Sequence, residues 1–471
     1  MKRLWKGLAL RRLLTMMVLV LLGFSCDKDE DPGNPNEYVN NWILENMQFW
    51  YYWNNTIPTK ADKSKEPDSF FKSLLNGQDR FSWIQEDFQE LLKSLQGVSK
   101  EAGFEFVLYR EDLNSNSLVA QVLYVKPASP AATAGLKRGD LFTFINDQRI
   151  TTDNYRELLG QMGAPFRISY RPLNYATMTF EGERALSLSV VEYAENPNFL
   201  HKVFTYNDRK IGYYVYNLFA TGPASGNNSY NNEMDQIFAD FKAQGVTDLV
   251  IDLRYNSGGA ESATRNLASL IGKGVNSSKI FTRREYNDGV EKAIIADPDL
   301  GEGYLRVKFT DKTQNIGDQL RNGRVYILTG SRSASASELL INGLRPYMDV
   351  FLIGNKTVGK NVGSISLFEE NDPKNKWGMQ PIVTKSFNAL DQSDYDGGFN
   401  PQILDADNSL SLYPLGDPNE RLLKRALKEI TGLPIFGREA ERERIMGDVI
   451  GHSLDAKRRS NQLVVDLVPF N

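Results

Sequence analysis

The spacing of apolar residues changes character along the chain. From about Tyr38 to Gly97, apolar and aromatic residues recur every three or four positions, as in YVNNWILENMQFWYYWNN, FFKSLL and FQELLKSL. This period is typical of helices with one buried face. We predict a small helical domain over residues 38–100, whose aromatic residues form its own core rather than a platform for a ligand.

The next stretch has the pattern of strands. GFEFVLYR and SLVAQVLYV predict two strands, and TDNYRELLGQM predicts an amphipathic helix. Between them, Pro127 and Pro130 open a turn, and Gly135 and Gly139 give the backbone freedom before the next apolar strand. The segment SPAATAGLKRGDLFTFIN resembles a PDZ domain, which implies a β-rich fold with two helices over residues 101–182.

The PDZ resemblance also implies a peptide-binding groove. In PDZ domains the backbone N–H groups of a loop bind a peptide carboxylate, and the peptide adds to the sheet as a strand. The residues that the resemblance assigns to this groove are Gly103, Phe104, Glu105 and Phe106 in the loop, with Tyr155 and Leu159 on the helix. The alternative is a PDZ-like spacer whose groove is closed.

Strands and helices alternate in the third unit, residues 183–432. IGYYVYNLF, DLVIDLRYNSGG, VYILTG and DVFLIG predict strands, and helical patterns stand between them. The strands are nearly continuous apolar runs, which indicates a sheet covered on both faces. We predict a layered α/β core, and hence a multidomain α/β protein.

Charge and cysteine content narrow the function classes. Lys plus Arg is 55 and Asp plus Glu is 59, so the net charge of -4 gives no reason to expect a nucleic-acid partner. The single cysteine excludes an intramolecular disulfide and a cysteine metal site within the chain. The two histidines, His201 and His452, do not have metal-ligand spacing, and we predict no metal site.

The first 26 residues predict a secretory signal. A basic head precedes the apolar run at residues 13–24, which is too short to cross a bilayer. Ser25 precedes Cys26 in a sequence that resembles a bacterial lipobox, so we predict lipidation of Cys26. The alternative is a plain secretory signal in which the cysteine is incidental.

An acidic tether follows Cys26. Residues 27–37, DKDEDPGNPNE, contain no core-forming side chain and resemble the surface-export signal of Bacteroidetes lipoproteins. We therefore predict a protein of the cell envelope, held at the outer membrane by a lipid anchor. The side of that membrane stays open.

Three short segments of the third unit carry candidate chemistry. Asn256-Ser257-Gly258-Gly259 ends a strand, and paired glycines let backbone N–H groups face a cavity, as an oxyanion hole requires. Ser335 in SRSASASELL stands at a predicted helix start, although with Glu338 it also fits a capping box. Lys360 in TVGKN follows the strand DVFLIG.

These segments fit together as a nucleophile and its base. A serine attacks an acyl carbon only when a base removes its proton, and burial can lower the pKa of a lysine enough for that task. One helix and one strand separate Ser335 from Lys360, so both can return to one edge of the sheet.

The order of motifs resembles the carboxy-terminal processing (tail-specific) serine peptidases. A helical segment, a PDZ domain, VIDLRYNSGG, SASASELL and TVGKNVGS follow one another as in that family, which implies a ClpP/crotonase-like core. The resemblance makes Ser335 the nucleophile and Lys360 the general base. It makes Gly258 or Gly259, together with Ala336, the oxyanion donors.

The chain departs from the family at one position. Many members have a glutamine four residues after the lysine, which orients it, whereas this chain has Ser364. Either the shorter Ser364 hydroxyl orients Lys360 or another group does. We expect Ser333 and Ser337 to be structural neighbours of the nucleophile, and Asp252 and Arg254 to be a structural pair or substrate contacts.

The sequence thus predicts a serine endopeptidase that cleaves proteins or peptides near their C-termini, after its PDZ domain has bound the substrate tail. No cofactor is implied. The alternatives are a non-catalytic peptide-binding lipoprotein on a protease scaffold and, on a crotonase-like core, a lipid carrier. Residues 433–471 combine a charged section with an apolar end. They pack on the core or make an oligomer contact, and the pattern does not choose.

Overall fold

The computed structural model describes residues 34–112, 115–433, 446–456 and 463–470. The predicted signal, Cys26 and most of the acidic tether lie outside these residues. Within the described part of the chain, no helix has the length and apolar content needed to cross a membrane.

The N-terminal segment is helical, as predicted. Helices α1 (Pro35–Trp50), α2 (Pro67–Ser73) and α3 (Phe88–Leu95) surround the short 3-10 helix η1 (Asn54–Thr56) and strand β1 (Trp83–Gln85). Helix α1 buries Val39, Ile43 and Met47, which recur at four-residue spacing along one face. It begins at Pro35, inside the predicted tether, because the Asn34 side chain accepts a hydrogen bond from the Asn36 N–H and caps it.

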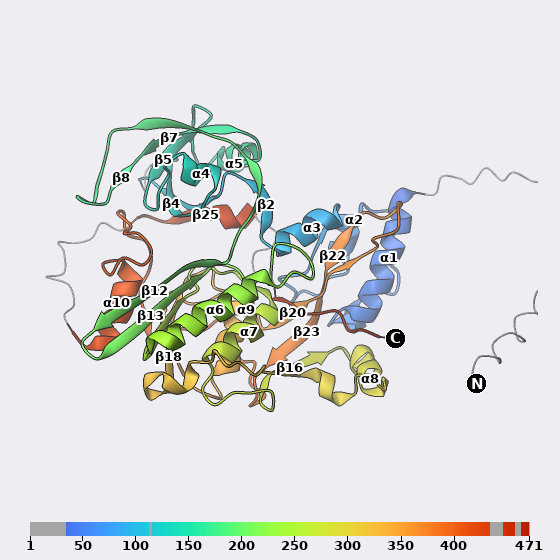
Figure 1. Ribbon diagram of the computed structural model, residues 1–471. Coiled ribbons are helices and arrows are strands. Elements are labelled where there is room, and N and C mark those ends of the chain that lie inside the picture. The colour runs from blue at the N-terminus through green and yellow to red at the C-terminus, as the bar shows by residue number, and fades with distance from the viewer. Residues whose placement is uncertain (1–33, 113–114, 434–445, 457–462, 471) are drawn as a thin grey trace, which may run out of the picture.

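The PDZ domain forms one sheet with two helices against it (Figure 1). Its strands follow the order β10-β7-β5-β4-β3-β25, and its helices are α4 (Pro130–Thr133) and α5 (Tyr155–Gln161). The strands are β3 (Phe104–Arg110), β4 (Leu118–Val125), β5 (Leu141–Ile145) with β6 (Gln148–Arg149), β7 (Phe166–Arg171), β10 (Arg184–Leu188) and β25 (Val449–His452).

The PDZ sheet continues past the predicted boundary at residue 182. Strand β10 pairs with β7 along its whole length, from Arg184 opposite Tyr170 to Leu188 opposite Phe166. The domain therefore extends to Leu188. Strand β11 (Val191–Ala194) then pairs with β2 (Val98–Glu101) beneath it, so the chain enters and leaves the domain side by side.

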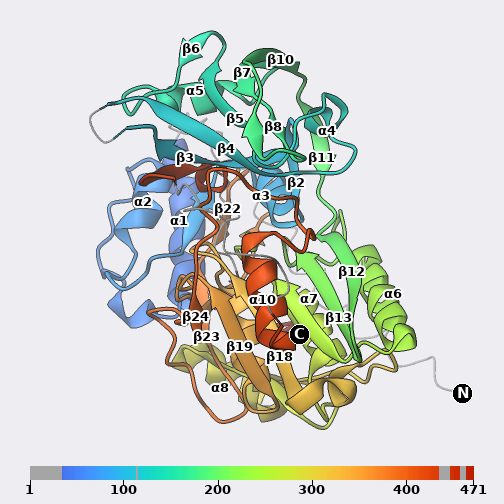
Figure 2. The ribbon, with the colours of Figure 1, turned by 90° about the vertical axis from the view of Figure 1, so that its left-hand side faces the viewer.

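The third unit is layered, as predicted, around a six-stranded sheet (Figure 2). The order is β12 (Asn198–Tyr206), β13 (Arg209–Tyr216), β14 (Asp248–Asp252), β18 (Arg324–Thr329), β19 (Asp349–Gly354) and β24 (Ile403–Leu404). Strands β13 to β24 are parallel, and β12 is an antiparallel edge strand.

Helices cover both faces of this sheet. Helices α6 (Ser229–Gln244), α7 (Glu261–Ile271) and α9 (Ala336–Leu344) share a core with Leu249 and Ile251 of β14. Helix α10 (Arg421–Thr431) packs on the other face, against Val250. Successive β14 side chains thus enter opposite layers, which explains its continuous apolar run.

The core contains a second six-stranded sheet, and a separate three-stranded sheet connects the core to the N-terminal segment. The order of this second sheet is β15 (Gly259–Ala260), β26 (Leu463–Val464), β20 (Val362–Ser364), β23 (Ile382–Phe387), β16 (Ile280–Tyr286) and β17 (Arg306–Lys308). Strand β1 pairs with β22 (Gly378–Gln380), which also pairs with β21 (Leu367–Phe368). The remaining elements are α8 (Asp288–Ala296), β8 (Leu173–Asn174), β9 (Thr179–Phe180) and the 3-10 turns η2 (Glu302–Leu305), η3 (Gly317–Gln319), η4 (Arg321–Gly323) and η5 (Ser453–Ala456).

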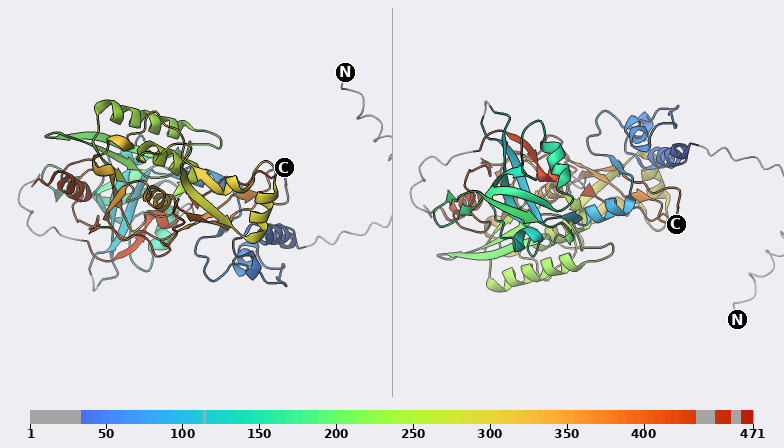
Figure 3. Two further views of the ribbon diagram at one scale, coloured as in Figure 1. Left: turned by 90° about the horizontal axis from the view of Figure 1, so that it is seen from below. Right: turned by 90° about the horizontal axis from the view of Figure 1, so that it is seen from above.

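The described parts of the C-terminal extension pack on the chain itself. Strand β25 joins the PDZ sheet, and β26 joins the second sheet of the core. The Phe470 ring then lies 6.1 Å from Phe49 and 5.9 Å from Trp50, so the end of the chain lies beside α1 (Figure 3). The extension therefore contacts all three units of the protein.

Candidate active site

Ser335 lies immediately before helix α9 in a strained conformation. Its φ of 61° and ψ of -111° are costly for a residue with a Cβ atom. The side chain is fully buried, and its hydroxyl has no hydrogen-bond partner among the described residues. A capping serine would accept a hydrogen bond from the first turn of its helix. Ser335 and Glu338 have the arrangement of a capping box, and the Ser335 N–H donates to Glu338, but the Ser335 hydroxyl itself makes no hydrogen bond within the described residues. Strain at a turn into a helix is typical of nucleophilic serines.

The two flanking serines are structural, as expected. The Ser333 hydroxyl donates to the Leu253 carbonyl oxygen at 2.7 Å, and the Ser337 hydroxyl donates to the Asn256 carbonyl oxygen at 3.0 Å. Both bonds fasten the start of α9 to the segment that follows β14. Only the middle serine of the three keeps its hydroxyl unpartnered within the described residues.

Lys360 is also fully buried. Its Nζ lies 4.9 Å from the centroid of the Phe81 ring, which the N-terminal segment supplies. Burial lowers the pKa of Lys360 to about 7, while the charges of Asp79 and Glu338 act in the opposite direction. Near neutral pH the amine is therefore available in its uncharged form, which a general base requires.

The backbone before Lys360 is tightly confined. Gly359 has a φ of 89°, and a Cβ atom there would overlap the carbonyl oxygen of Asp396. Gly398 has a φ of 82°, and a Cβ atom there would overlap the carbonyl oxygen of Thr357. Segments 357–359 and 396–398 thus pack backbone against backbone, which fixes where Lys360 begins.

One carboxylate joins the serine segment to the lysine segment. Glu338 Oε2 accepts hydrogen bonds from the N–H groups of Ser335 and Lys360, each at 2.8 Å. Its Oε1 accepts from the Thr357 hydroxyl and the Gly359 N–H, each at 2.6 Å. Burial raises the pKa of Glu338, and these hydrogen bonds oppose the rise. A single oxygen atom therefore holds Ser335 and Lys360 next to each other.

The sequence alone does not indicate that Glu338 connects these two segments. Its only local signal was the three-residue spacing from Ser335, which indicated a capping box. The bonds to Thr357, Gly359 and Lys360 span 19 to 22 residues and depend on the folded sheet edge.

The paired glycines lie at the strand end that faces α9. Gly258 donates its N–H to Asn256 Oδ1 at 2.9 Å, so the structure gives this N–H an acceptor within its own turn. Gly259 has a φ of 136°, and a Cβ atom there would overlap the Phe219 carbonyl oxygen. Its position requires glycine, and oxyanion binding by Gly259 and Ala336 stays a prediction.

Ser364 lies on β20, fully buried. Its hydroxyl donates to Oε1 of Gln380 at 2.8 Å and lies 3.2 Å from the Leu463 carbonyl oxygen. Gln380 is a buried glutamine that strand β22 supplies. A glutamine is therefore present beside the position that the family pattern assigns to one, although it comes from another strand. The orientation of Lys360 by Ser364 stays a prediction.

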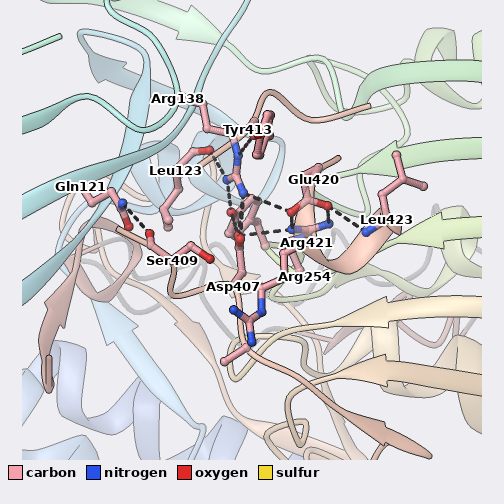
Figure 4. Close-up of polar contacts among 12 residues, drawn as sticks. Gln121, Leu123, Arg138, Arg254, Asp407, Ser409, Tyr413, Glu420, Arg421 and Leu423 are labelled. Atoms are coloured by element: carbon pink, nitrogen blue, oxygen red, sulfur yellow. Dashed lines mark hydrogen bonds and ion pairs between the residues drawn. The ribbon is translucent and has the colours of Figure 1, made fainter. Parts of the chain in front are cut away.

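Asp252 and Arg254 form the expected structural pair, within a larger buried network (Figure 4). Arg254 donates to Asp252 at 2.7 Å and to the Glu420 carboxylate at 2.5 and 2.8 Å. Asp407 lies 3.3 Å from Arg254 and accepts from Arg138 of the PDZ domain at 2.8 and 2.9 Å. The network connects the PDZ domain to the strand end that precedes the paired glycines.

The predicted PDZ groove residues lie at the start of β3 and on α5. The edge of β3 that does not pair with β4 is occupied by another strand of the chain. Strand β25 runs antiparallel to β3, with Gly451 opposite Leu108 and His452 opposite Val107. Glu105 is fully buried and lies 3.1 Å from the Lys126 ammonium. This edge is the one that a peptide ligand would extend.

Within the described residues, no group of three or more His, Cys, Asp or Glu side chains has a metal-binding arrangement.

Three family models match the chain in the predicted order. "Peptidase S41 N-terminal domain" matches residues 38–83, "PDZ domain" matches residues 121–170, and "Peptidase family S41" matches residues 210–395. The last range contains Gly259, Ser335 and Lys360.

Two curated relatives agree with these matches. A carboxyl-terminal-processing protease of Picosynechococcus is 24% identical over 304 residues, which are 64% of this chain and 63% of that protein. A CtpA-like serine protease of Staphylococcus aureus is 22% identical over 337 residues, 70% of this chain and 58% of that protein. The chain thus spans less than two thirds of the length of these relatives.

A solved structure covers more of the molecule. A protein of Bacteroides fragilis assigned to the S41 proteases is 29% identical, with a TM-score of 0.69, over 83% of this chain and 97% of that one. The similarity therefore extends over most of the chain. By its three matched domains and its fold, this chain belongs to peptidase family S41.

Proposed function

We propose that the protein is a serine endopeptidase in which Ser335 is the nucleophile and Lys360 is the general base. One observation carries the proposal. A buried serine hydroxyl without a described partner and a buried lysine with a pKa of about 7 are held together by the Glu338 carboxylate. Both groups are in the state that nucleophilic catalysis needs near neutral pH.

The reaction follows from these groups. The uncharged amine of Lys360 takes the proton of the Ser335 hydroxyl, and the serine oxygen attacks the scissile carbonyl carbon. The N–H groups of Gly259 and Ala336 would stabilise the tetrahedral oxyanion. The Lys360 ammonium then protonates the leaving amine. Water, activated by the same lysine, releases the acyl group from Ser335.

The substrates that we propose are proteins or peptides bound through their C-terminal tails by the PDZ domain. The relatives named for carboxyl-terminal processing support this choice. We also propose lipidation at Cys26 and a place in the cell envelope, because a basic and apolar leader precedes that cysteine. The proposal includes no oligomeric state.

The test is cleavage of an unstructured protein with an apolar C-terminus by the chain lacking residues 1–26. We expect cleavage by the parent and a loss of about 10³-fold or more in Ser335→Ala and in Lys360→Ala. Ser331→Ala and Lys356→Ala are the matched controls, because both residues are exposed in the same two segments.

Each outcome decides between two functions. Activity in Lys360→Ala close to that of the parent would reject Lys360 as the base. A parent that binds the substrate tail but never cleaves it would make the protein a binding module on a protease scaffold.

A further inference from the structure

The C-terminal extension occupies the PDZ groove in the manner of a peptide ligand. Strand β25 adds antiparallel to β3, and the Arg110 N–H donates to the Asp448 carbonyl oxygen at 3.0 Å. Ile450 packs against the apolar core of the PDZ domain, as do Tyr155 and Leu159, the two helix residues predicted to line the groove. A Cβ atom at the neighbouring Gly451 would lie 3.5 Å from the Tyr155 ring. Strand addition with an apolar contact to the helix is how PDZ domains hold their ligands.

The extension also satisfies the loop that would bind a ligand carboxylate. The Phe106 N–H, one of the predicted donors, gives its hydrogen bond to the Ser453 hydroxyl oxygen at 2.9 Å. The same hydroxyl donates to Glu105 at 2.6 Å. A donor that would face a substrate tail is thus already used by the chain itself.

The second part of the extension lies in the catalytic sheet. Strand β26 runs parallel between β15 and β20, with Leu463 opposite Gly259 and Val464 opposite Ser364. The Val465 N–H donates to the Ser364 carbonyl oxygen at 2.9 Å. Gly259 belongs to the predicted oxyanion turn, and β20 begins two residues after Lys360. An extended chain therefore fills the slot between the two strands that frame the site.

Side chains alternate along β26 and the residue that follows it. Leu463 and Val465 are 0% and 2% exposed, whereas Val464 between them is half-buried. An ion pair between Arg332 and Asp455 ties the same extension to the loop that precedes Ser335. Residues 457–462 lie outside the described residues and carry none of this argument.

We infer that residues 447–456 and 463–470 are intramolecular peptide ligands, which fill the PDZ groove through β25 and the slot between β15 and β20 through β26. A substrate tail binds after it has displaced these segments. The slot accepts an extended peptide with apolar side chains at alternate positions, as Leu463 and Val465 have. This inference rests on the proposed function, because it treats the slot as the place of the substrate.

A tethered ligand is hard to displace. Because it belongs to the same chain, its effective concentration is on the order of millimolar, so micromolar free peptides compete poorly. Weakening β26 or β25 should therefore reveal binding that the intact chain hides.

The experiment measures binding in a Ser335→Ala background, so that it does not depend on catalysis. A fluorescent peptide with the sequence of residues 463–471 is titrated into the chain lacking residues 1–26. We expect Leu463→Asp to bind the peptide at least about tenfold more tightly than the background protein, because a buried charge expels β26. Leu467→Asp, the same change at an exposed position, should bind it as the background does.

The PDZ groove has its own matched pair. A fluorescent peptide with the sequence of residues 447–456 is used with Ile450→Asp and with Val449→Asp, whose side chain is 60% exposed. A gain in binding of about tenfold is expected for Ile450→Asp alone. If Leu463→Asp lowers the thermal midpoint by more than a few degrees, a chain ending after Ala456 repeats the first test without introducing a charge.

Equal peptide binding by the background protein and by the chain ending after Ala456 would overturn the inference for the slot. Equal binding by Ile450→Asp and Val449→Asp would overturn it for the groove. If the parent cleaves substrate but these variants gain no peptide binding, the tethered-ligand inference is rejected and the peptidase function stands. If the variants gain binding but the parent is inactive, the tethered-ligand inference stands and the peptidase function is rejected.

Discussion

Two buried basic residues, Arg254 and Lys360, lie in the same core and differ in their protonation near neutral pH. Arg254 is surrounded by the carboxylates of Asp252, Glu420 and Asp407, which direct their oxygens at its guanidinium group. Lys360 has Glu338 nearby, but the oxygens of that carboxylate accept from backbone N–H groups and a hydroxyl. Arg254 therefore stays charged, whereas burial lowers the pKa of Lys360 to about 7.

The comparison shows that the use of the neighbouring carboxylate oxygens, rather than depth alone, separates a structural cation from a catalytic base. A carboxylate whose oxygens bind the cation directly keeps that cation charged. A carboxylate whose oxygens accept hydrogen bonds from the backbone positions the lysine but stabilises the lysine's charge less.

Removing Arg254 should have the largest effect on folding. Arg254→Ala leaves Asp252 and Glu420 buried without their cation, which should lower the free energy of unfolding by roughly 3–5 kcal/mol. Chemical denaturation measures it. Arg324→Ala breaks a partly exposed pair with Asp349 and should change the value by less than about 1 kcal/mol. Similar losses in both variants would contradict the role of the network.

The pH dependence of catalysis should report the state of Lys360. Below a pH of about 7 the amine is an ammonium ion and accepts no proton from Ser335. We expect kcat/KM to rise about tenfold per pH unit up to that value and then to level off. Steady-state kinetics between pH 5 and 9 would show it. A rise that continues to pH 10 would mean that Lys360 keeps its ordinary pKa.

Replacing Lys360 with an apolar side chain should stabilise the fold while it abolishes activity. Unfolded Lys360 holds its proton up to pH 10.5, but folded Lys360 releases it near 7. Between these values the unfolded state binds more protons, so the stability of the parent rises with pH. Lys360→Met should therefore raise the free energy of unfolding by about 4 kcal/mol at pH 7, and by less as the pH approaches 10.5.

Lys356→Met is the control for that measurement, because Lys356 is exposed in the same segment. Its stability should match that of the parent at every pH. A loss of stability in Lys360→Met would show that the site holds the ammonium favourably, against the comparison.

The smallest effect is expected at the carboxylate that positions both groups. Glu338→Gln places an amide nitrogen against N–H donors, so we expect kcat to fall about tenfold with little change in KM. The negative charge of Glu338 raises the pKa of Lys360, so its removal should also shift the acid limb of the pH profile to lower pH. A merely structural role would lower the activity without moving that limb.

Much of this architecture was readable from the sequence. Strand β14 is buried on both faces, so its apolar run DLVID predicted the layered core. Ser335 was singled out because it stands at a predicted helix start, and Lys360 because it follows the strand DVFLIG; the family resemblance gave both their predicted roles. Elements of two or three residues, such as β15, β20 and β26, were missed because they are too short to show a period.

Long-range contacts account for the rest. Gln380 reaches Ser364 from another strand, and β25 reaches β3 from more than 300 residues away. Nothing in the local pattern of either segment indicates its partner. The continuation of the PDZ sheet past residue 182 was not apparent for the same reason, since the place of β10 is decided by its pairing with β7.

The backbone contact between segments 357–359 and 396–398 has a consequence for how this protein can change over time. Gly359 and Gly398 each exclude any side chain because a carbonyl oxygen of the other segment occupies its place. Neither residue has a functional group. Selection would nonetheless hold both as strictly as the nucleophile, and a complete mutational scan would group these two glycines with Ser335.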